Sequence, residues 1–313
     1  MKHFETLIQL QDHFASEQVC RDHLAALRWG ADGIPCCPFC GVVGAYSIEK
    51  GKRFKCKDKG CAKKFSVTVG TVFENTKLPL RVWFAAIYLA CNSSKGVSSL
   101  QLSRNLGITQ KTGWFLLCRI REMLIERTPT LLHGVVEADE TYIGGAETNK
   151  HAVKRTEGMY GGKGKAPVLG ILERDGRVVV KPIENSKRAT IQPIVRQHVA
   201  IGSVLSTDEH TGYKGMRKTY SHITVNHHTG EYVKGNAHTN GIENFWSLMK
   251  RGINGIYHQV SPKHLHRYCD EYAYRFNNRL ARQEDKFNTA VFQADGRRLT
   301  YRLLIGKDKV SCP

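Results

Sequence analysis

The chain has 313 residues, 41% of them hydrophobic and 24% charged, which is the composition of a globular protein with a sizeable core and two or three domains. Its 47 lysine and arginine residues exceed the 28 acidic residues and leave a formal net charge of +19, above the magnitude of about 2–8 typical of small soluble domains. This charge favours a polyanionic partner, and the absence of any run of about 18 apolar residues argues against a membrane protein.

The N-terminal segment, residues 1–35, has apolar residues at helical spacing and lacks the apolar block that a signal peptide needs. Gly30, Gly33 and Pro35 then interrupt the pattern, so we expect a helical segment that ends before the first cysteine pair. Without a secretion signal the chain is expected to stay in the cytoplasm, where its ten cysteines argue for reduced thiols or metal ligands rather than disulfides.

The segment 36–75 contains two cysteine pairs with the spacing of a structural zinc site. The pairs have two and four intervening residues, with 15 residues between them: Cys37 and Cys40, then Cys56 and Cys61. Four thiolates at this spacing can close a tetrahedral site, and so short a segment has too little core to fold without a metal. Cys36 competes with Cys37, and four unrelated buried thiols are the alternative. We predict a zinc ribbon that holds one Zn²⁺.

The same segment is strongly basic. From residue 50 to residue 64 the one acid is Asp58, against eight basic residues: Lys50, Lys52, Arg53, Lys55, Lys57, Lys59, Lys63 and Lys64. A basic surface held rigid by a metal is suited to DNA phosphate, and we predict that Lys52, Arg53 and Lys55 bind DNA.

The next segment returns to helical character and contains a predicted helix-turn-helix. Ser98 can cap a short helix, Gly107 permits a sharp turn, and Thr109 can cap a second helix. Gln110 and Lys111 at the start of that second helix would face a DNA major groove. Because the pattern is degenerate, a purely structural helical hairpin is the alternative.

From Val135 onward the sequence changes to short apolar runs separated by glycine-rich turns, which predicts strands at VVEAD, PVLGILE, RVVVKPI and SVLSTD. Helical patterning resumes after about Asn240. Residues 146–166 are polar, glycine-rich and basic, and we interpret them as a mobile loop facing DNA or, equally well, as a plain solvated loop.

Three acids stand where metal-dependent phosphoryl transfer needs them. Asp139 ends VVEAD, Asp208 ends SVLSTD, and Glu243 is near the start of the helical GIENFWSLMKRGI. Carboxylates at strand ends and on a neighbouring helix can converge, and two Mg²⁺ or Mn²⁺ ions about 4 Å apart could then activate the attacking oxygen and stabilise the leaving one. Glu137, on the same strand face, is a rival of Asp139. The alternative for each acid is a solvated surface residue.

The spacing around Glu243 adds a basic partner. Glu243 lies 35 residues after Asp208, and Lys250 lies seven residues after Glu243. Seven residues are about two helical turns, so Lys250 returns to the Glu243 face about 10 Å away. There Lys250, with Arg251 beside it, can hold DNA phosphate next to the metals.

These features resemble a known family. The CPFCG ribbon, FSVTVGTVFENTKLPL, the helix-turn-helix, VVEADETYIGG, STDEHTGY and HTNGIENFWSLMKRG through YAYRFNNR are similar, in this order, to the ISXO-type insertion-sequence transposases of the DDE superfamily. The resemblance implies a ribonuclease H-like core of the retroviral integrase superfamily. It also implies Mg²⁺-dependent cleavage at inverted terminal repeats and strand transfer into target DNA. Some members have an asparagine at the third catalytic position, which makes Asn240 a rival of Glu243; we favour Glu243 for its spacing and its Lys250 partner.

We therefore expect an α+β multidomain protein, whose core is an α/β ribonuclease H-like domain, that binds double-stranded DNA, forms a homo-oligomer in the DNA complex and is associated with a prokaryotic nucleoid. Its expected parts are a helical segment (1–35), a zinc ribbon (36–75), a helix-turn-helix region (76–130), a catalytic domain (131–290) and a C-terminal tail (291–313). A catalytically silent DNA-binding regulator would explain the charge, the ribbon and the helix-turn-helix, but not the spaced acids. A stand-alone nuclease would explain the acids but not the terminal-repeat reader.

Overall fold

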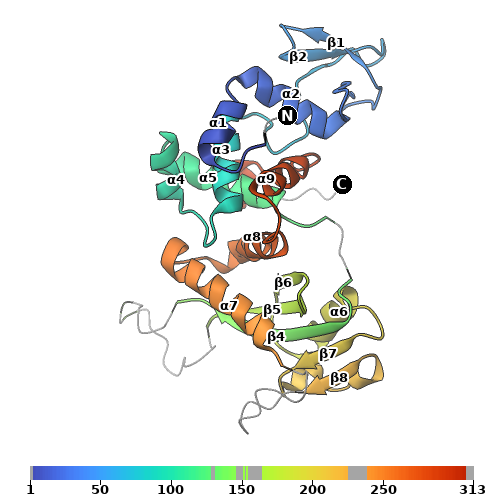
Figure 1. Cartoon of the computed structure of the whole chain (residues 1–313), viewed down its shortest axis with the longest axis vertical. Helices are drawn as coiled ribbons and strands as arrows, with labels where there is room; N and C mark the ends of the chain where they lie inside the picture. The colour runs from blue at the N-terminus through green and yellow to red at the C-terminus, as the bar shows by residue number, and fades with distance from the viewer. Residues whose placement is uncertain are drawn as a thin grey trace. The chain divides into compact units, whose positions relative to one another are not determined.

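The computed structural model describes residues 3–127, 131–145, 151, 153, 164–224 and 238–307. The chain forms two compact units, one made of residues 1–124 with 280–313 and the other of residues 125–279 (Figure 1). Most of the loop expected at 146–166 lies outside the described residues. Among the helices that are described, none is long and apolar enough to cross a membrane.

The first unit consists of helices and one small sheet. Its helices are α1 (Leu7–His13), α2 (Glu17–Trp29), α3 (Leu80–Asn92), α4 (Ser99–Leu106), α5 (Gln110–Met123), α9 (Gln283–Phe292) and α10 (Tyr301–Leu304). The sheet is antiparallel in the order β1 (Ala45–Ile48), β2 (Arg53–Cys56) and β3 (Lys64–Phe65). The side chain of Ser16 accepts a hydrogen bond from the Val19 N–H, so the expected N-terminal helical segment consists of two helices, with Ser16 capping the second.

Aromatic rings from both ends of the chain form the core of this unit. Phe287 on α9 is fully buried, and its ring centroid lies 5.4 Å from Phe4, 5.7 Å from Phe14 and 5.2 Å from Phe84. Residues 280–290, expected in the catalytic domain, and the expected tail after 290 therefore belong to the N-terminal unit. The boundary falls at Arg279 because Phe287 packs into an aromatic core that sequence periodicity could not locate.

The second unit is built on a five-stranded mixed sheet in the order β6–β5–β4–β7–β8. The strands are β4 (Val135–Ile143), β5 (Ala166–Glu173), β6 (Val178–Pro182), β7 (Val204–Thr207) and β8 (Ser221–Thr224). The first three in chain order pair antiparallel, while β7 pairs parallel with both β4 and β8. The central strand β4 thus separates an antiparallel half of the sheet from a parallel half.

Helices cover both faces of this sheet (Figure 1). Helix α6 (Arg188–His198) packs with Ile191 and Val195 against Val136 and Ala138 of β4. On the other face, α7 (Asn240–Gly252) and α8 (Leu265–Asn277) pack against β5 and β6 through a second apolar cluster. Because side chains alternate along a strand, the odd-numbered residues of β4, Asp139 among them, face α7.

Candidate metal centres and nucleic-acid-binding elements

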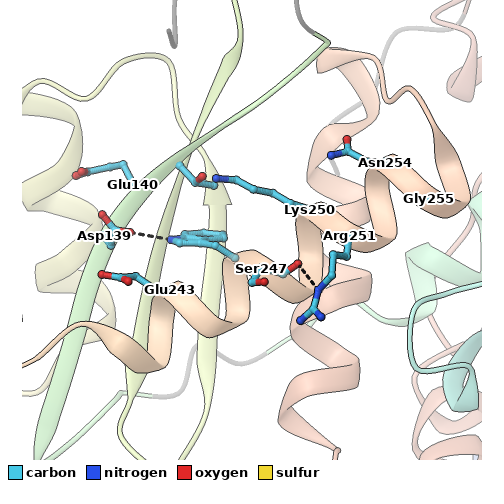
Figure 2. Close-up of a pocket in the computed structure, with 10 residues that line it drawn as sticks. Asp139, Glu140, Glu243, Ser247, Lys250, Arg251, Asn254 and Gly255 are labelled. Carbon is cyan, nitrogen blue, oxygen red and sulfur yellow. Dashed lines mark hydrogen bonds between the residues drawn. The ribbon is translucent and has the colours of Figure 1, made fainter.

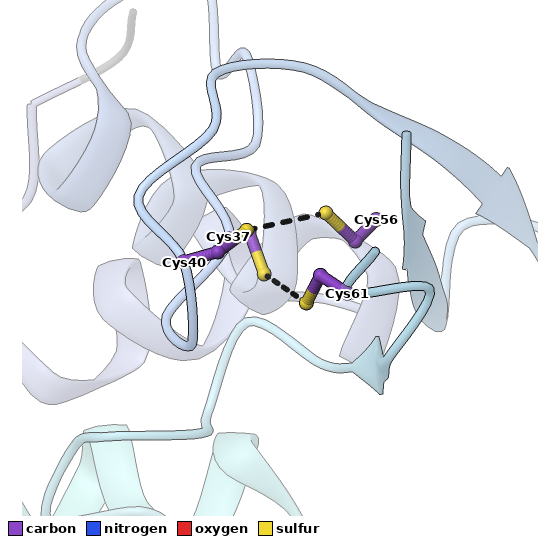
Figure 3. A group of neighbouring side chains, drawn as sticks. All are labelled: Cys37, Cys40, Cys56 and Cys61. Atoms are coloured by element: carbon purple, nitrogen blue, oxygen red, sulfur yellow. Dashed lines mark hydrogen bonds between the residues drawn. The ribbon is translucent and has the colours of Figure 1, made fainter. Parts of the chain in front are cut away.

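The four predicted cysteines converge at one point beside the small sheet (Figure 3). Their sulfur atoms all lie within 4.8 Å of one another. The sulfurs of Cys37 and Cys61 are 3.8 Å apart and those of Cys40 and Cys56 are 3.5 Å apart, close to the edge of about 3.8 Å in a tetrahedral zinc–thiolate site. This set fits one structural Zn²⁺. The competing Cys36 is outside it, with its thiol 3.4 Å from the Gly41 carbonyl oxygen.

Backbone N–H groups favour the thiolate form of Cys37, which is the form that binds a metal. Burial opposes ionisation of Cys37, but hydrogen bonds from the backbone of Phe39 and Cys40 lower the pKa of its thiol to about 7. Burial raises the pKa of Cys56. Four thiolates in mutual contact repel one another, so full deprotonation requires the positive charge that a bound metal brings.

The predicted basic contacts of the ribbon are displayed to solvent. Arg53 and Lys55 are exposed on β2, and Lys52 is exposed in the turn before it. Arg53 also makes a surface ion pair with Glu49 at 3.4 Å, a contact that contributes little to stability. The ribbon therefore presents positive charge on β2, the strand that ends at Cys56 of the four-cysteine site.

Helices α4 and α5 form the compact helical pair that the sequence suggested. Ser98 and Thr109 cap the two helices by accepting hydrogen bonds from Gln101 N and Thr112 N. Gly107 has a φ of 64°, the left-handed conformation that ends α4, and Gly113 lets the helices approach closely, because a Cβ there would lie 2.9 Å from the Ser99 carbonyl oxygen. At the start of α5, Gln110 and Lys111 are exposed.

Register brings two of the predicted acids to neighbouring positions. Ala138 of β4 is paired with Thr207 of β7 in the parallel half of the sheet. Asp139 is the next residue of β4 and Asp208 is the first residue after β7, so the two acids lie at the same level on neighbouring segments. The Asp208 carboxylate also accepts a hydrogen bond from His210 N at 3.0 Å, which starts the turn after β7.

Helix α7 supplies the remaining predicted residues. A pocket of about 760 Å³ is lined by Asp139, Glu140, Thr141, Glu243, Trp246, Ser247, Lys250, Arg251, Asn254 and Gly255. Figure 2 shows the carboxyl groups of Asp139, Glu140 and Glu243 directed to the same side, with Lys250 and Arg251 further along α7. Asn240, the rival of Glu243, is the first residue of α7 and is not among the lining residues. Asp208 lines a separate pocket with Lys214 and Arg217.

The acids influence one another electrostatically. Burial raises the pKa of Asp139 to about 6, and the negative charges of Asp208 and Glu243 add to this rise. Burial likewise raises the pKa of Glu140 to about 8; the Tyr213 hydroxyl opposes the rise, and Asp208 and Asp139 increase it. These shifts mark a place where negative charge is costly and a cation would be stabilised.

The carboxylates are neighbours without forming a closed set of ligands. Among the described residues, the cysteines are the one group of three or more metal-ligand side chains whose ligand atoms all lie within 4.8 Å. Asp139 and Glu243 line one pocket and Asp208 another. The predicted acids thus come together at one end of the sheet, at wider spacing than the cysteines.

Glu137, the rival of Asp139, has a different role. It is fully buried, and its Oε2 accepts a hydrogen bond from the backbone N–H of Ile242 at 2.9 Å. Its Oε1 is bound by Arg174 at 3.2 Å and lies 3.3 Å from His238 Nδ1. A carboxylate used in this way anchors the N-terminus of α7, where helix N–H groups lack partners, and has no oxygen facing the pocket.

The lining residues that were not predicted from the sequence include a further acid and a hydrogen-bond donor to Asp139. Glu140 follows Asp139 directly and lines the same pocket, which the adjacent acid in VVEADE could have signalled. Trp246 is buried, and its indole N–H donates a hydrogen bond to Asp139 Oδ2 at 3.0 Å. Its position three residues after Glu243, one helical turn away, was the available signal.

Comparison with known proteins agrees with this geometry. Residues 131–277 match the ISXO2-like transposase domain, and residues 15–64 match the transposase zinc-ribbon domain. An uncharacterized protein in transposable element ISH50 of Halobacterium salinarum is 29% identical over 255 residues, which are 77% of this chain and 84% of that protein. An uncharacterized transposase-like protein of Haemophilus influenzae is 31% identical over 103 residues, 33% of this chain and 82% of that protein.

A zinc-ribbon unit and a mixed-sheet unit with clustered acids define a protein of the transposase class. The chain belongs to the ISXO2-like transposase family, as its sequence motifs indicated. Transposase and zinc-ribbon domains together imply DNA binding, and the transposase domain indicates a DNA-processing enzyme.

Proposed function

We propose that this protein is a DDE-type DNA transposase that cuts at the inverted terminal repeats of an insertion sequence and joins the freed 3′-hydroxyl to target DNA. One observation carries the proposal. Asp139, Asp208 and Glu243 come from β4, the end of β7 and α7, yet the charges of Asp208 and Glu243 raise the pKa of Asp139. Asp208 and Glu243 are 69 and 104 residues after Asp139 in the chain, yet they are its electrostatic neighbours at one sheet edge.

The topology supports a ribonuclease H-like core for the second unit. Two antiparallel strands precede a parallel pair in space, with β4 central, and helices cover both faces. Asp139 lies where the parallel pairing of β4 with β7 ends, and Glu243 lies in the first turn of the helix packed on that face. The proposed reaction needs acids in this order, so the topology supports the proposal.

The residues fit Mg²⁺. Asp139, Asp208 and Glu243 offer hard oxygen ligands, and their spacing leaves room for water and phosphate oxygens, as Mg²⁺ prefers. Two bound Mg²⁺ ions would activate the attacking oxygen and stabilise the leaving oxygen. We favour Glu243 over Asn240 as the third ligand because Glu243 lines the pocket with Asp139.

Basic side chains beside the acids would hold the DNA backbone. Lys250 and Arg251 line the same pocket as Asp139 and Glu243, so a phosphate between them would meet positive charge on one side and the metal ligands on the other. This arrangement orients the scissile phosphate while leaving its reacting oxygens free. It also explains why α7 carries an acid in its first turn and two cations in its last turn.

The first unit would read the element ends. We propose that Gln110 and Lys111 at the start of α5 enter a major groove, as in a helix-turn-helix, and that Lys52, Arg53 and Lys55 on the ribbon bind phosphates. Because two element ends must meet one target, we also propose that the protein acts as a homo-oligomer in its DNA complex.

A catalytically silent regulator is the second candidate, favoured by the same ribbon and helical pair. It would bind terminal-repeat DNA without changing it. The clustered acids favour the transposase over the regulator. Carboxylates that repel one another lower the stability of the fold unless a cation binds them, and a silent regulator would have no use for that cation.

The test uses the full-length zinc-loaded protein, Mg²⁺ and a duplex that carries the inverted repeats flanking the gene. We expect nicks that leave a 3′-hydroxyl, and joined products when target DNA is added. Asp139→Asn should reduce cleavage by roughly 100-fold or more while DNA affinity is retained, since even partners of metal ligands contribute about 10–100-fold. The exposed Glu184 provides a matched control, and Glu184→Gln should cut like the parent.

Denaturing gels measure cleavage and joining, and fluorescence anisotropy measures DNA binding. Equal cutting by Asp139→Asn and the parent would remove Asp139 from the mechanism. A parent that binds the repeats tightly but never cuts them in Mg²⁺ or Mn²⁺ would establish the regulator instead.

A further inference from the structure

We propose that Trp246 is a positioning residue that fixes one oxygen of Asp139 and thereby orients the other toward the metal; this rests on the proposed function. The indole N–H of Trp246 donates a hydrogen bond to Asp139 Oδ2 at 3.0 Å. In Figure 2 this bond is the dashed line that ends at Asp139. A carboxylate held through one oxygen cannot rotate freely, so its second oxygen keeps a defined direction.

The indole is suited to this role by its chemistry and its burial. It offers a single donor and no acceptor, so it can bind the carboxylate but cannot compete for a cation. The Trp246 side chain is 4% exposed, within the apolar cluster that α7 shares with β5 and β6. Asp139 is therefore bound by a donor whose own position is fixed by packing.

A glycine on the neighbouring strand makes room for the ring. Gly170 of β5 is the direct cross-strand partner of Asp139. A Cβ at residue 170 would lie 2.5 Å and 2.7 Å from two indole carbons of Trp246 and 2.8 Å from Ile242 Cδ1, closer than real Cβ contacts. The ring therefore lies directly over the backbone at Gly170, and any larger residue there would displace it from Asp139.

The backbone of α7 is fixed one turn earlier. Glu137 Oε2 accepts a hydrogen bond from Ile242 N at 2.9 Å. Strand β4 therefore contacts α7 twice, through Glu137 at the start of the helix and through Asp139 at Trp246. Glu243 lies between these two contacts. One rigid helix would thus carry one metal ligand and orient another, which sets the geometry between them before any metal binds.

Removal of the indole N–H should weaken metal binding with little change to the fold. Trp246→Phe keeps an aromatic ring and deletes the donor. We expect Mn²⁺ to bind the zinc-loaded full-length variant about 10- to 100-fold more weakly than the parent, the loss typical of partners of metal ligands. The spectroscopic signal of Mn²⁺, followed by electron paramagnetic resonance, measures free and bound ion without any activity assay.

Phe245→Leu is the matched control. Phe245 is 1% exposed and its ring lies 5.3 Å from that of Trp246, so this change perturbs the same apolar cluster without touching Asp139. Its Mn²⁺ affinity should stay within about threefold of the parent, a change of about 0.7 kcal/mol or less. Equal weakening by both variants would assign the effect to packing and overturn the positioning role.

A second measurement does not depend on metal. The chain has four tryptophans, so ¹⁵N-tryptophan labelling yields four indole signals, and the one lost in Trp246→Phe belongs to Trp246. Asp139→Ala should shift that signal far more than the other three. An unmoved signal, or unchanged Mn²⁺ affinity in Trp246→Phe, overturns the inference. If Asp139→Asn binds Mn²⁺ as tightly as the parent does, the proposed function is overturned and the positioning role with it.

Discussion

The three acids of β4, Glu137, Asp139 and Glu140, have different environments. Glu137 and Asp139 face α7, but Glu137 is fully buried at the helix start while Asp139 lines the pocket. Glu140 lines the pocket too, beside the buried ring of Tyr213. Burial and a neighbour's charge therefore separate the roles of three residues that look alike in the sequence.

Glu140 gives a pH prediction for the protein without added Mg²⁺. Burial raises its pKa from 4.5 to about 8, so its contribution to stability is full below about pH 4.5 and is lost as pH rises through 8. Glu140→Gln mimics the protonated form. Between pH 5 and pH 8.5 the variant should therefore lose less unfolding free energy than the parent, by on the order of 3 kcal/mol once partial exposure is allowed for.

Urea denaturation at the two pH values, with zinc retained, measures this difference. Glu184→Gln, an exposed acid of the same unit, should follow the parent. Parallel pH dependences for Glu140→Gln and the parent would contradict the assignment of a buried, proton-binding carboxyl at residue 140.

At the scale of elements, the ribbon depends on its cysteines more than on its core. Its apolar cluster has three buried members, Cys37, Cys56 and Phe65, of which two are proposed metal ligands. So small a cluster contributes little hydrophobic free energy. The three short strands are therefore expected to hold together through zinc.

Cys40→Ser should convert the ribbon from a zinc-bound to an unfolded segment. Cys40 is exposed, so its replacement removes a ligand without opening a cavity. Structural zinc sites bind their metal with an apparent free energy of about 10–16 kcal/mol, and the variant loses this contribution to folding. We expect the zinc content to fall from one ion per chain to near zero, with rapid proteolysis between residues 36 and 65. Elemental analysis and limited proteolysis measure both.

Cys36→Ser is the control for this change, because Cys36 is next to the site yet outside the four-sulfur group. It should keep one zinc per chain. Zinc retained by Cys40→Ser and lost by Cys36→Ser would reverse the ligand assignment.

At the scale of the whole molecule, the chain returns to its first unit after completing its second. Helix α9 supplies Phe287, which is fully buried among rings from α3 and the N-terminal segment. The first unit therefore cannot form its complete core until the C-terminal region has been synthesised.

Phe287→Ala should destabilise the first unit by about 3–5 kcal/mol, the usual cost of deleting a buried phenylalanine ring. Hydrogen exchange should then rise in α3 and α9 and remain unchanged in β4 and β5. Phe292→Ala is the matched control, since Phe292 ends the same helix but is 62% exposed. Equal effects of the two variants, or faster exchange in β4, would contradict this division of the chain.

Local pattern determined much of this protein. Cysteine spacing, the capping residues around Gly107, and acids at the ends of apolar runs each depend on contacts or periodicities within a few residues, so the sequence alone indicated the ribbon, the helical pair and the candidate acids. The family resemblance added the expected ribonuclease H-like core and the expected reaction.

Long-range packing gave Glu137 an environment different from that of Asp139, brought Trp246 into contact with Asp139, and included α9 in the first unit. Each outcome depends on a partner distant in the chain: Ile242 for Glu137, Asp139 for Trp246, and Phe4 for Phe287. Such contacts leave no periodic signal, because they arise when separate elements pack and one side chain fills the space that another leaves.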